Sequence, residues 1–353
     1  MQDITPHNIQ SLVSLIDKAY KIAIVGHMRP DGDALGSCVG MYHFLKASKK
    51  TDISIILPHR APSYLDFLLD KNTSKVIRIH EDKPKQAESA ILESDLIICL
   101  DFNAFHRTDG LENSLQNSEA KKVLIDHHLN PEREQFTLSF SETEVSSASE
   151  FLYQILMKTP LIDGDAGKLP IEAAVALMTG MTTDTNNFAN SVFPSTLRMA
   201  SDLIEVGVDR NMILSNLYNQ YREPRMRLMG HVLKDLMTIT ADGVAYIVLD
   251  SKVLKEYYIE DGDTEGFVNL PLSMAKVKMS VLLKEDGDRI RVSIRSKKGI
   301  SANRCSQLHF NGGGHENAAG GRLYIPKDVA SIEAAAAYVE EHTHIFMTQE
   351  NEK

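Results

Sequence analysis

Tryptophan is absent from this chain of 353 residues, and cysteine is rare. The three cysteines, Cys38, Cys99 and Cys305, are far apart and form no CxxC pair, which argues against a disulfide framework and a structural zinc site. We expect buried free thiols in a reducing, cytoplasmic setting. No apolar run approaches the roughly 20 residues that a membrane helix needs, and the first residues lack the basic and apolar segments of a signal peptide. We therefore expect a cytoplasmic protein without a membrane partner.

The chain has fewer basic than acidic residues: 38 Lys and Arg against 48 Asp and Glu, which gives a net charge of −10. Proteins that hold long nucleic acid by its backbone usually present a basic face. A long duplex is therefore an unfavourable partner. A short or small anionic substrate stays compatible with the composition if metal ions and a few Arg or Lys residues supply local positive charge.

Short apolar segments alternate with helical patterns in the first part of the chain. The expected strands are residues 21–25, 52–57, 75–79, 95–101 and 121–128, and the expected helices are 6–20, 34–46, 64–69, 148–157, 171–181 and 196–206. This alternation predicts an α/β domain with a parallel sheet.

The pattern changes after residue 239. We expect strands at 244–249, 277–283, 290–294 and 323–325, followed by a final helix over 329–342. The predicted organisation is a parallel-sheet domain over residues 1–208, a helical linker over 209–238, a smaller α/β domain over 239–346 and a polar tail over 347–353.

Side chains that bind metal ions stand where apolar segments of the first domain end. They are His27, Asp31 and Asp33 after the first strand, Asp101 at the end of the fourth, His127 and His128 at the end of the fifth, and Asp184 after an apolar helix. Ligands bind at the carboxyl ends of the strands in parallel sheets, so we expect the strand-end residues to converge. Histidine and aspartate without cysteine suit Mn²⁺ better than structural zinc.

Seven such residues are enough for two ions that share a bridging carboxylate. Two ions about 3.5–4 Å apart can activate water and stabilise both oxygens of an in-line displacement at phosphorus. The reaction class that follows is phosphoester hydrolysis.

Two of these ligand-type motifs, and a glycine-rich segment later in the chain, also have simpler interpretations. Asp31 and Asp33 can cap the helix that begins near Ala34, and Asp184 can be an ordinary helix-end residue. The glycine-rich segment 312–321 can expose backbone N–H groups to a phosphate, or it can form a flexible turn before a strand. Glycine content alone does not decide between these two interpretations.

The combined motifs resemble a known family. The tripeptide that begins at Asp126, with HxxxDGD beginning at His27, is similar to the DHH phosphoesterase superfamily. The segment GGGHxxAAG beginning at Gly312 is similar to the C-terminal DHHA1 domain of that superfamily. The resemblance covers residues 20–345, and the compact layout resembles the nanoRNase and pAp-phosphatase branch.

The resemblance implies roles for particular residues. It implies one metal on His27, Asp31 and Asp101, and a second on Asp33, Asp101, His127 and Asp184, with Asp101 as the bridge and His128 facing the scissile phosphate. In the second domain it implies a substrate-binding set of Arg295, Ser296, Asn303, Gly313, Gly314 and His315, with the active site in the cleft between the domains. This chain has Asn186-Asn187 where the family often has glycine, and asparagine tolerates a left-handed backbone better than most residues.

We therefore expect a metal-dependent hydrolase that converts short oligoribonucleotides to mononucleotides and also converts 3′-phosphoadenosine 5′-phosphate to AMP. Its cofactors would be two divalent ions, with Mn²⁺ favoured over Mg²⁺ or Co²⁺. The alternatives are a phosphodiesterase for cyclic dinucleotides or pApA and, from another class, a non-catalytic nucleotide sensor. The presence of all seven ligand-type residues argues against the sensor. The sequence leaves a homodimer open.

Overall fold

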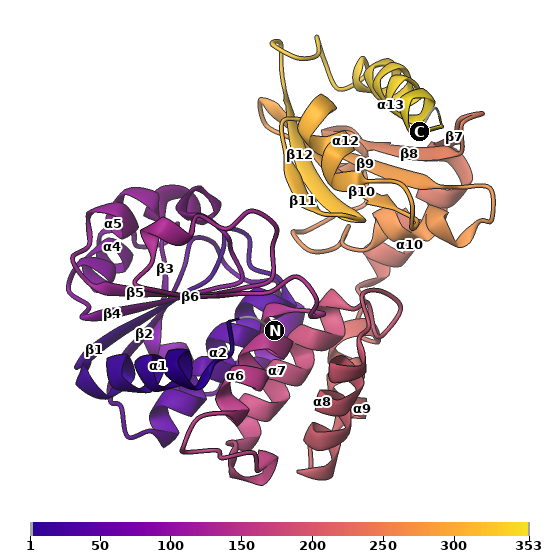
Figure 1. Cartoon of the computed structure of the whole chain (residues 1–353). Coiled ribbons are helices and arrows are strands. Elements are labelled where there is room, and N and C mark those ends of the chain that lie inside the picture. The colour runs from indigo at the N-terminus through magenta and orange to yellow at the C-terminus, as the bar shows by residue number, and fades with distance from the viewer. Residues whose placement is uncertain (1–2, 352–353) are drawn as a thin grey trace. The chain divides into compact units, whose positions relative to one another are not determined.

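The computed structural model describes residues 3–351 and forms two compact units, residues 1–220 and 221–353 (Figure 1). The division falls inside the segment expected to be a helical linker. Helix α9 (Arg210–Tyr218) belongs to the first unit, whereas α10 (Glu223–His231) and the π-helical turn η5 (Val232–Leu236) belong to the second. Among the described residues, no helix is both long and apolar enough to cross a membrane.

A six-stranded sheet with the order β3-β2-β1-β4-β5-β6 forms the centre of the first unit, and every neighbouring pair is parallel. The strands are β1 (Lys21–Val25), β2 (Asp52–Leu57), β3 (Ile77–Ile79), β4 (Leu96–Leu100), β5 (Lys121–Asp126) and β6 (Leu138–Ser141). The parallel α/β class predicted from the sequence is confirmed. Strand β6 was not expected, because its four residues are too few for a clear apolar pattern.

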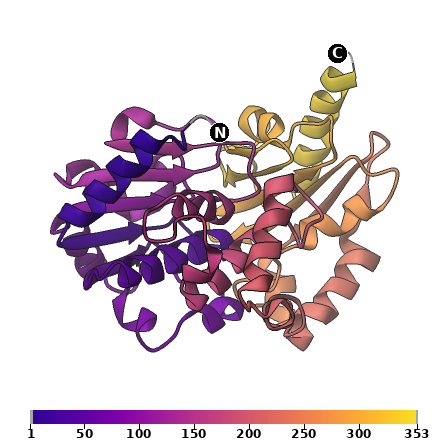
Figure 2. The ribbon, with the colours of Figure 1, turned by 60° about the horizontal axis from the view of Figure 1, so that its bottom comes forward.

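Helices cover both faces of this sheet (Figure 1). One face carries α1 (Pro6–Lys18), α2 (Gly32–Ala47), α6 (Ala148–Met157) and α7 (Ile171–Asp184), and the other carries α4 (Pro84–Leu92) and α5 (Glu112–Asn117). Figure 2 turns the first of these faces toward the viewer. Helix α8 (Pro194–Glu205) packs outside α6 and α7.

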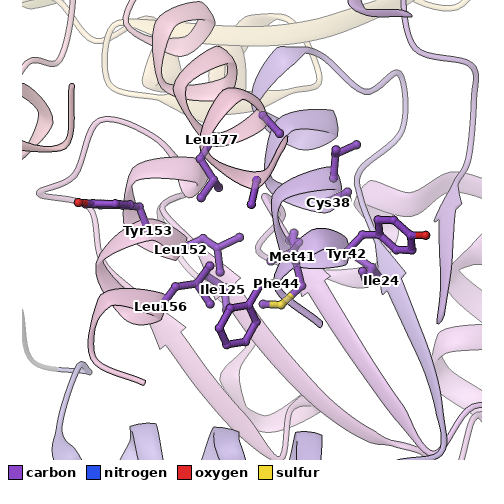
Figure 3. Packing of buried hydrophobic residues seen from close by; sticks show 14 of the residues in the cluster. Ile24, Cys38, Met41, Tyr42, Phe44, Ile125, Leu152, Tyr153, Leu156 and Leu177 are labelled. Atoms are coloured by element: carbon purple, nitrogen blue, oxygen red, sulfur yellow. The ribbon is translucent and has the colours of Figure 1, made fainter. Parts of the chain in front are cut away.

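The larger core of the first unit lies between the sheet and these helices. Figure 3 shows Met41 of α2, Leu152 of α6 and Leu177 of α7 packed above Ile24 and Ile125 of the strands. All five side chains are fully buried. Complete burial of one such side chain stabilises a fold by about 1.5–3 kcal/mol, so this core fixes the helices relative to the strand ends.

Glycines allow α2 and α7 to approach closely. A Cβ atom on Gly36 would lie 2.5 Å from the carbonyl oxygen of Ala176, and one on Gly180 would lie 2.0 Å from Ser149 Oγ and 2.8 Å from Asp33 Oδ1. Neither position has room for a side chain. The close packing brings the start of α2 and the end of α7 to the same place.

The second unit is built on a six-stranded mixed sheet with the order β11-β12-β10-β9-β8-β7. Its strands are β7 (Met237–Ile239), β8 (Val244–Leu249), β9 (Met279–Asp286), β10 (Arg289–Ser296), β11 (Gly313–His315) and β12 (Ala318–Tyr324). Strands β8 and β9 are parallel, and the other pairs are antiparallel. Helix α12 (Ala302–His309) packs on the sheet, as does α13 (Ala335–Asn351).

The final helix differs from the expected one at both ends. It starts at Ala335 rather than near residue 329, and it continues through residues that we expected to form a polar tail. Phe346 and Met347 are buried in the core of the second unit, and Arg304 Nη1 pairs with Glu350 Oε1 at 2.6 Å. These contacts keep the last turns helical. Residues 352–353 of the expected tail lie outside the described residues.

Candidate active site

Adjacent strands bring the predicted ligands together. His27 follows β1, Asp101 follows β4 and His127 follows β5; β4 pairs with both of the other strands. The carboxylate of Asp101 therefore lies between the two imidazoles. Its Oδ2 is 3.3 Å from His27 Nε2, and its Oδ1 is 3.4 Å from His127 Nε2.

Asp101 is shared by two groups of ligand-type side chains, besides a third that it forms with Asp126 and His128. The first group contains His27, Asp31 and Asp101, and the second contains Asp33, Asp101 and His127. Within each group, the candidate ligand atoms all lie within 4.8 Å of one another. Asp184 at the end of α7 lies beside the second group, with its Oδ2 3.6 Å from His127 Nε2. The composition of the two groups corresponds to the ligand sets that the family resemblance implies.

Backbone groups hold His27 and Asp33 in place. Nδ1 of His27 lies 2.8 Å from the carbonyl oxygen of Met28. A proton on Nδ1 makes this hydrogen bond, and it leaves the lone pair of Nε2 directed at the carboxylates. The carboxylate of Asp33 accepts from the N–H groups of Ala148 and Ser149, at 2.7 and 2.9 Å, in the first turn of α6.

The capping interpretation holds for Asp31. Asp31 Oδ1 accepts from the N–H groups of Asp33 and Ala34, at 3.0 and 3.1 Å, so it is the N-cap of α2. The same oxygen is 3.9 Å from His27 Nε2. Asp31 therefore stabilises a helix start and also faces the first group. Asp33 does not cap α2, because its carboxylate points at α6.

His128 is positioned by Asp126, a residue that the sequence analysis gave no role. Nδ1 of His128 lies 2.7 Å from Oδ1 of the fully buried Asp126, whose Oδ2 accepts from the N–H of His128 at 3.1 Å. A carboxylate at this distance fixes the proton on Nδ1. This leaves Nε2 as the ring nitrogen of His128 that can accept a proton.

Several carboxylates lie close together in this site and shift the pKa values of its residues. Burial alone lowers the pKa of His27 and His127, but the hydrogen bond to Asp101 and the nearby carboxylates raise them to about 9 and about 10. Burial would raise the pKa of Asp101, yet hydrogen bonds from both histidines hold it well below its usual range. Burial and the charges of Asp101 and Asp184 raise the pKa of Asp33 well above its usual range. The cluster therefore favours bound positive charge.

The donor set fits divalent metal ions of the Mn²⁺, Mg²⁺ or Co²⁺ type. The groups present are carboxylate oxygens and imidazole nitrogens, which these ions accept. Cys38 is the buried thiol close enough to feel the charges of Asp101 and Asp33, and burial raises its pKa well above the usual range. It stays protonated and is a poor ligand.

The loop after Asp184 has the backbone that asparagine makes possible. Asn186 and Asn187 have φ values of 46° and 56°, in the left-handed region, and Phe188 follows at 67°. Asn187 also accepts a hydrogen bond from Arg210. The loop therefore keeps a left-handed turn without glycine.

In the second unit, the glycine-rich segment is ordered. Gly313–His315 form the edge strand β11, which pairs with β12, so the alternative of a flexible turn was wrong. Gly314 has a φ of 152°, and a Cβ on it would lie 2.6 Å from the carbonyl oxygen of Ala318. The N–H of Gly314 donates to Asn303 Oδ1 at 2.9 Å, so two of the expected substrate-binding residues are in contact.

Strand register places two further expected residues on one sheet face. Arg295 of β10 and His315 of β11 both stand opposite Ala318 of β12. Residues directly opposite in a sheet share a face. Ser296 points to the other face, where its Oγ donates to Ile300 O at 2.6 Å and accepts from Asn317 Nδ2 at 3.0 Å. Ser296 therefore fixes a loop rather than presenting a free hydroxyl.

Comparisons with known proteins match these features. Residues 21–181 match the N-terminal domain of the DHH family, and residues 242–341 match the DHHA1 domain. A relative from Thermus thermophilus, named bifunctional oligoribonuclease and PAP phosphatase NrnA, is 31% identical over 88% of this chain and 87% of its own length. A cyclic-di-AMP phosphodiesterase GdpP from Geobacillus thermodenitrificans is 26% identical over 89% of this chain, which covers only 46% of that protein.

The fold also matches a solved structure. The crystal structure of an exopolyphosphatase-related protein from Bacteroides fragilis has a TM-score of 0.89 and 34% identity, and the match covers 99% of both chains. Sequence motifs, domain order and fold all agree. The chain belongs to the DHH family and carries that family's DHHA1 domain.

Proposed function

We propose that this protein is a metal-dependent phosphoesterase that hydrolyses short oligoribonucleotides to mononucleotides and 3′-phosphoadenosine 5′-phosphate to AMP. The observation that carries the proposal is the pair of ligand groups joined by the carboxylate of Asp101. It is supported by the relative named bifunctional oligoribonuclease and PAP phosphatase, which the chain matches over most of its length.

We assign the first metal ion to His27, Asp31 and Asp101, and the second to Asp33, Asp101, His127 and Asp184. Mn²⁺ is the ion that we favour, with Mg²⁺ and Co²⁺ as alternatives. Bound divalent ions supply Lewis acidity, which activates water at neutral pH and neutralises charge on phosphate oxygens. The three free, buried cysteines fit a reducing, cytoplasmic setting.

His128 and Asp126 handle a proton near the reacting phosphate in this proposal. Asp126 keeps Nδ1 of His128 protonated and stabilises the imidazolium that forms if Nε2 takes up a proton. Nε2 can then donate that proton to the phosphate or to the leaving oxygen. We expect Asp126→Asn to lower turnover by about 10- to 100-fold, because the orienting acceptor is lost.

We assign recognition of the rest of the substrate to the second unit. Arg295, Asn303, Gly313, Gly314 and His315 would hold its terminal phosphate and base, while Ser296 keeps the neighbouring loop in place. A guanidinium and an imidazole are suitable phosphate donors, whereas the Gly314 amide is held by Asn303 and fixes the strand beside them.

The test is turnover of the RNA dinucleotide pApA and of 3′-phosphoadenosine 5′-phosphate, measured side by side with Mn²⁺ and with chelator. The proposal expects hydrolysis of both substrates with Mn²⁺ and of neither with chelator. Hydrolysis of pApA alone would restrict the enzyme to the oligonucleotide reaction. No hydrolysis of either compound would refute the proposal.

A second candidate activity is cleavage of cyclic-di-AMP, because the chain matches a relative named for that reaction. The chain spans less than half of that relative, so this activity has weaker support. Comparing cyclic-di-AMP with pApA under the same conditions separates the two. Faster hydrolysis of the cyclic compound would favour the second candidate.

A further inference from the structure

Arg107 lies beside the first ligand group, on a segment that the sequence analysis did not single out. It belongs to the 3₁₀ segment η2 (Phe105–Leu111), a few residues after Asp101. The carbonyl oxygen of Arg107 accepts from the N–H of Met28 at 2.8 Å, and its own N–H donates to Ala104 O at 3.1 Å. Both backbone polar groups of Arg107 are therefore hydrogen-bonded, and the carbonyl group is bonded to the residue that follows His27.

The half-buried side chain of Arg107 carries a donor that no described residue satisfies. Its Nε is buried and makes no hydrogen bond. Arg225 also has a buried Nε without a hydrogen bond, but its terminal nitrogens donate to the carbonyl oxygens of Asp263 and Glu265. Leaving a buried donor unsatisfied costs about 1–3 kcal/mol, more when it is charged. The buried Nε of Arg107 is thus a donor for which the described residues supply no acceptor.

The positive charge of Arg107 acts on His27, a member of the first ligand group. Arg107 is close enough to His27 for its positive charge to act against the nearby carboxylates. The charges that act on His27 in the opposite sense include the carboxylates of Asp101 and Asp31. A planar guanidinium beside a metal group is well suited to a phosphate, because two of its N–H groups can meet two oxygens at once.

We propose that Arg107 binds the substrate phosphate through paired N–H bonds to its non-bridging oxygens, beside the His27 group. The inference rests on the proposed phosphoesterase function and adds a substrate-contacting residue in the first unit. Arg107 would orient the phosphate and stabilise the negative charge that grows on its oxygens as the displacement proceeds.

The experiment compares Arg107→Gln and Arg107→Lys with the wild type and with Arg198→Gln. Arg198 is exposed on α8 and serves as the matched control. The readouts are kcat and KM for pApA, the affinity for AMP by calorimetry, metal content and thermal unfolding. We expect Arg107→Gln to lower kcat/KM about 100-fold, as loss of one transition-state donor does, and to weaken AMP binding with metal content unchanged. Arg107→Lys should restore only part of the loss, because an ammonium lacks the paired donors.

Three results would overturn the inference. The first is a wild-type kcat/KM and AMP affinity in Arg107→Gln, and the second is full restoration of activity by Arg107→Lys. The third is loss of metal from Arg107→Gln, which would show that Arg107 positions the ligand His27 and does not bind the phosphate. Failure of the proposed function looks different, because the wild type itself would then hydrolyse neither substrate. Calorimetry with inorganic phosphate still tests Arg107 in that case.

Discussion

The two units of this chain are prepared for anions in opposite ways. The first unit gathers buried carboxylates and imidazoles, which need cations before they can accept a phosphate. The second unit offers half-buried donors on a sheet, with Arg295 and His315 in register and the Gly314 amide tied to Asn303. In the function that we propose, chemistry belongs to the first unit and recognition to the second, so the two can be disturbed separately.

The largest effect is expected from Asp101→Ala in the first unit. This change removes the carboxylate between His27 and His127, so both ligand groups lose a member. Turnover of pApA should fall by more than about 1000-fold, beyond what one lost donor costs, with a cooperative unfolding transition retained. Metal analysis should show loss of bound ions. Asp66→Ala, an exposed site on η1 (Ser63–Leu68), is the control. Retained turnover with bound metal would contradict a shared ligand.

The ligand groups of the first unit and His309 of the second unit should also respond to pH with opposite signs in metal-free protein. The pKa values of His27 and His127 are about 9 and about 10, above the 6.5 of an unfolded histidine. Their contribution is complete below pH 6.5 and is lost as pH rises toward 9 and 10. In the second unit, burial and His342 lower the pKa of His309, so its contribution is lost as pH falls below 6.5.

Hydrogen exchange of the metal-free protein measures this difference unit by unit. Protection of the first unit should decline between pH 6.5 and 10 after correction for intrinsic exchange, whereas protection near His309 should decline on acidification. Binding of Mn²⁺ should remove the alkaline decline, because ligated histidines are unprotonated. A parallel response of both units would contradict the charge assignment.

Gly180→Ala tests whether helix contact holds the first site together. The new methyl group would overlap Ser149 Oγ and crowd Asp33 Oδ1. Overpacking of this kind costs about 1–3 kcal/mol, so denaturant midpoints should fall and metal affinity should weaken with them. An unchanged midpoint would show that α6 and α7 can separate without cost.

How much of the site the sequence reveals depends on the kind of contact. His27, Asp101 and His127 could be predicted to converge, because each follows a strand of one parallel sheet and strand ends share an edge. Asp184 could not be placed in that way, because its position depends on the close approach of Gly36 and Gly180 on two helices. Arg107 gave no pattern at all, since it lies on an irregular 3₁₀ segment whose hydrogen bond to Met28 no sequence pattern reveals.

The second unit was harder to predict for a similar reason. Apolar patterns revealed β8 and β10, but the short edge strand at Gly313–His315 contains two glycines and no apolar residue. Its pairing with β12 depends on register, which the sequence does not specify there. The contact between Asn303 and Gly314 follows from that register, so only the family resemblance pointed to it.

Asn303→Ala is expected to affect binding without affecting the metal centre. The change removes the acceptor of the Gly314 amide, and a lost hydrogen bond of this type costs about 1 kcal/mol. We expect KM for pApA to rise roughly 5-fold, which corresponds to that energy, with little change in kcat or metal content. A fall in kcat at constant KM would instead connect Asn303 to the chemical step.

The smallest effect is expected at Gly230 in α10, the second-unit counterpart of the test at Gly180. No atom outside its own helix lies within 4 Å of a Cβ built on Gly230, and it is not among the glycines with positive φ. Gly230→Ala should therefore stabilise the protein by about 0.5–1 kcal/mol, because alanine loses less backbone freedom on folding. Chemical denaturation measures the change, and pApA turnover should stay at the wild-type rate. Destabilisation instead would mean that α10 is packed against a surface at this position. Glycine-to-alanine substitution would then be destabilising in both units. The free space around a helix glycine would no longer separate the crowded site at Gly180 from the open site at Gly230.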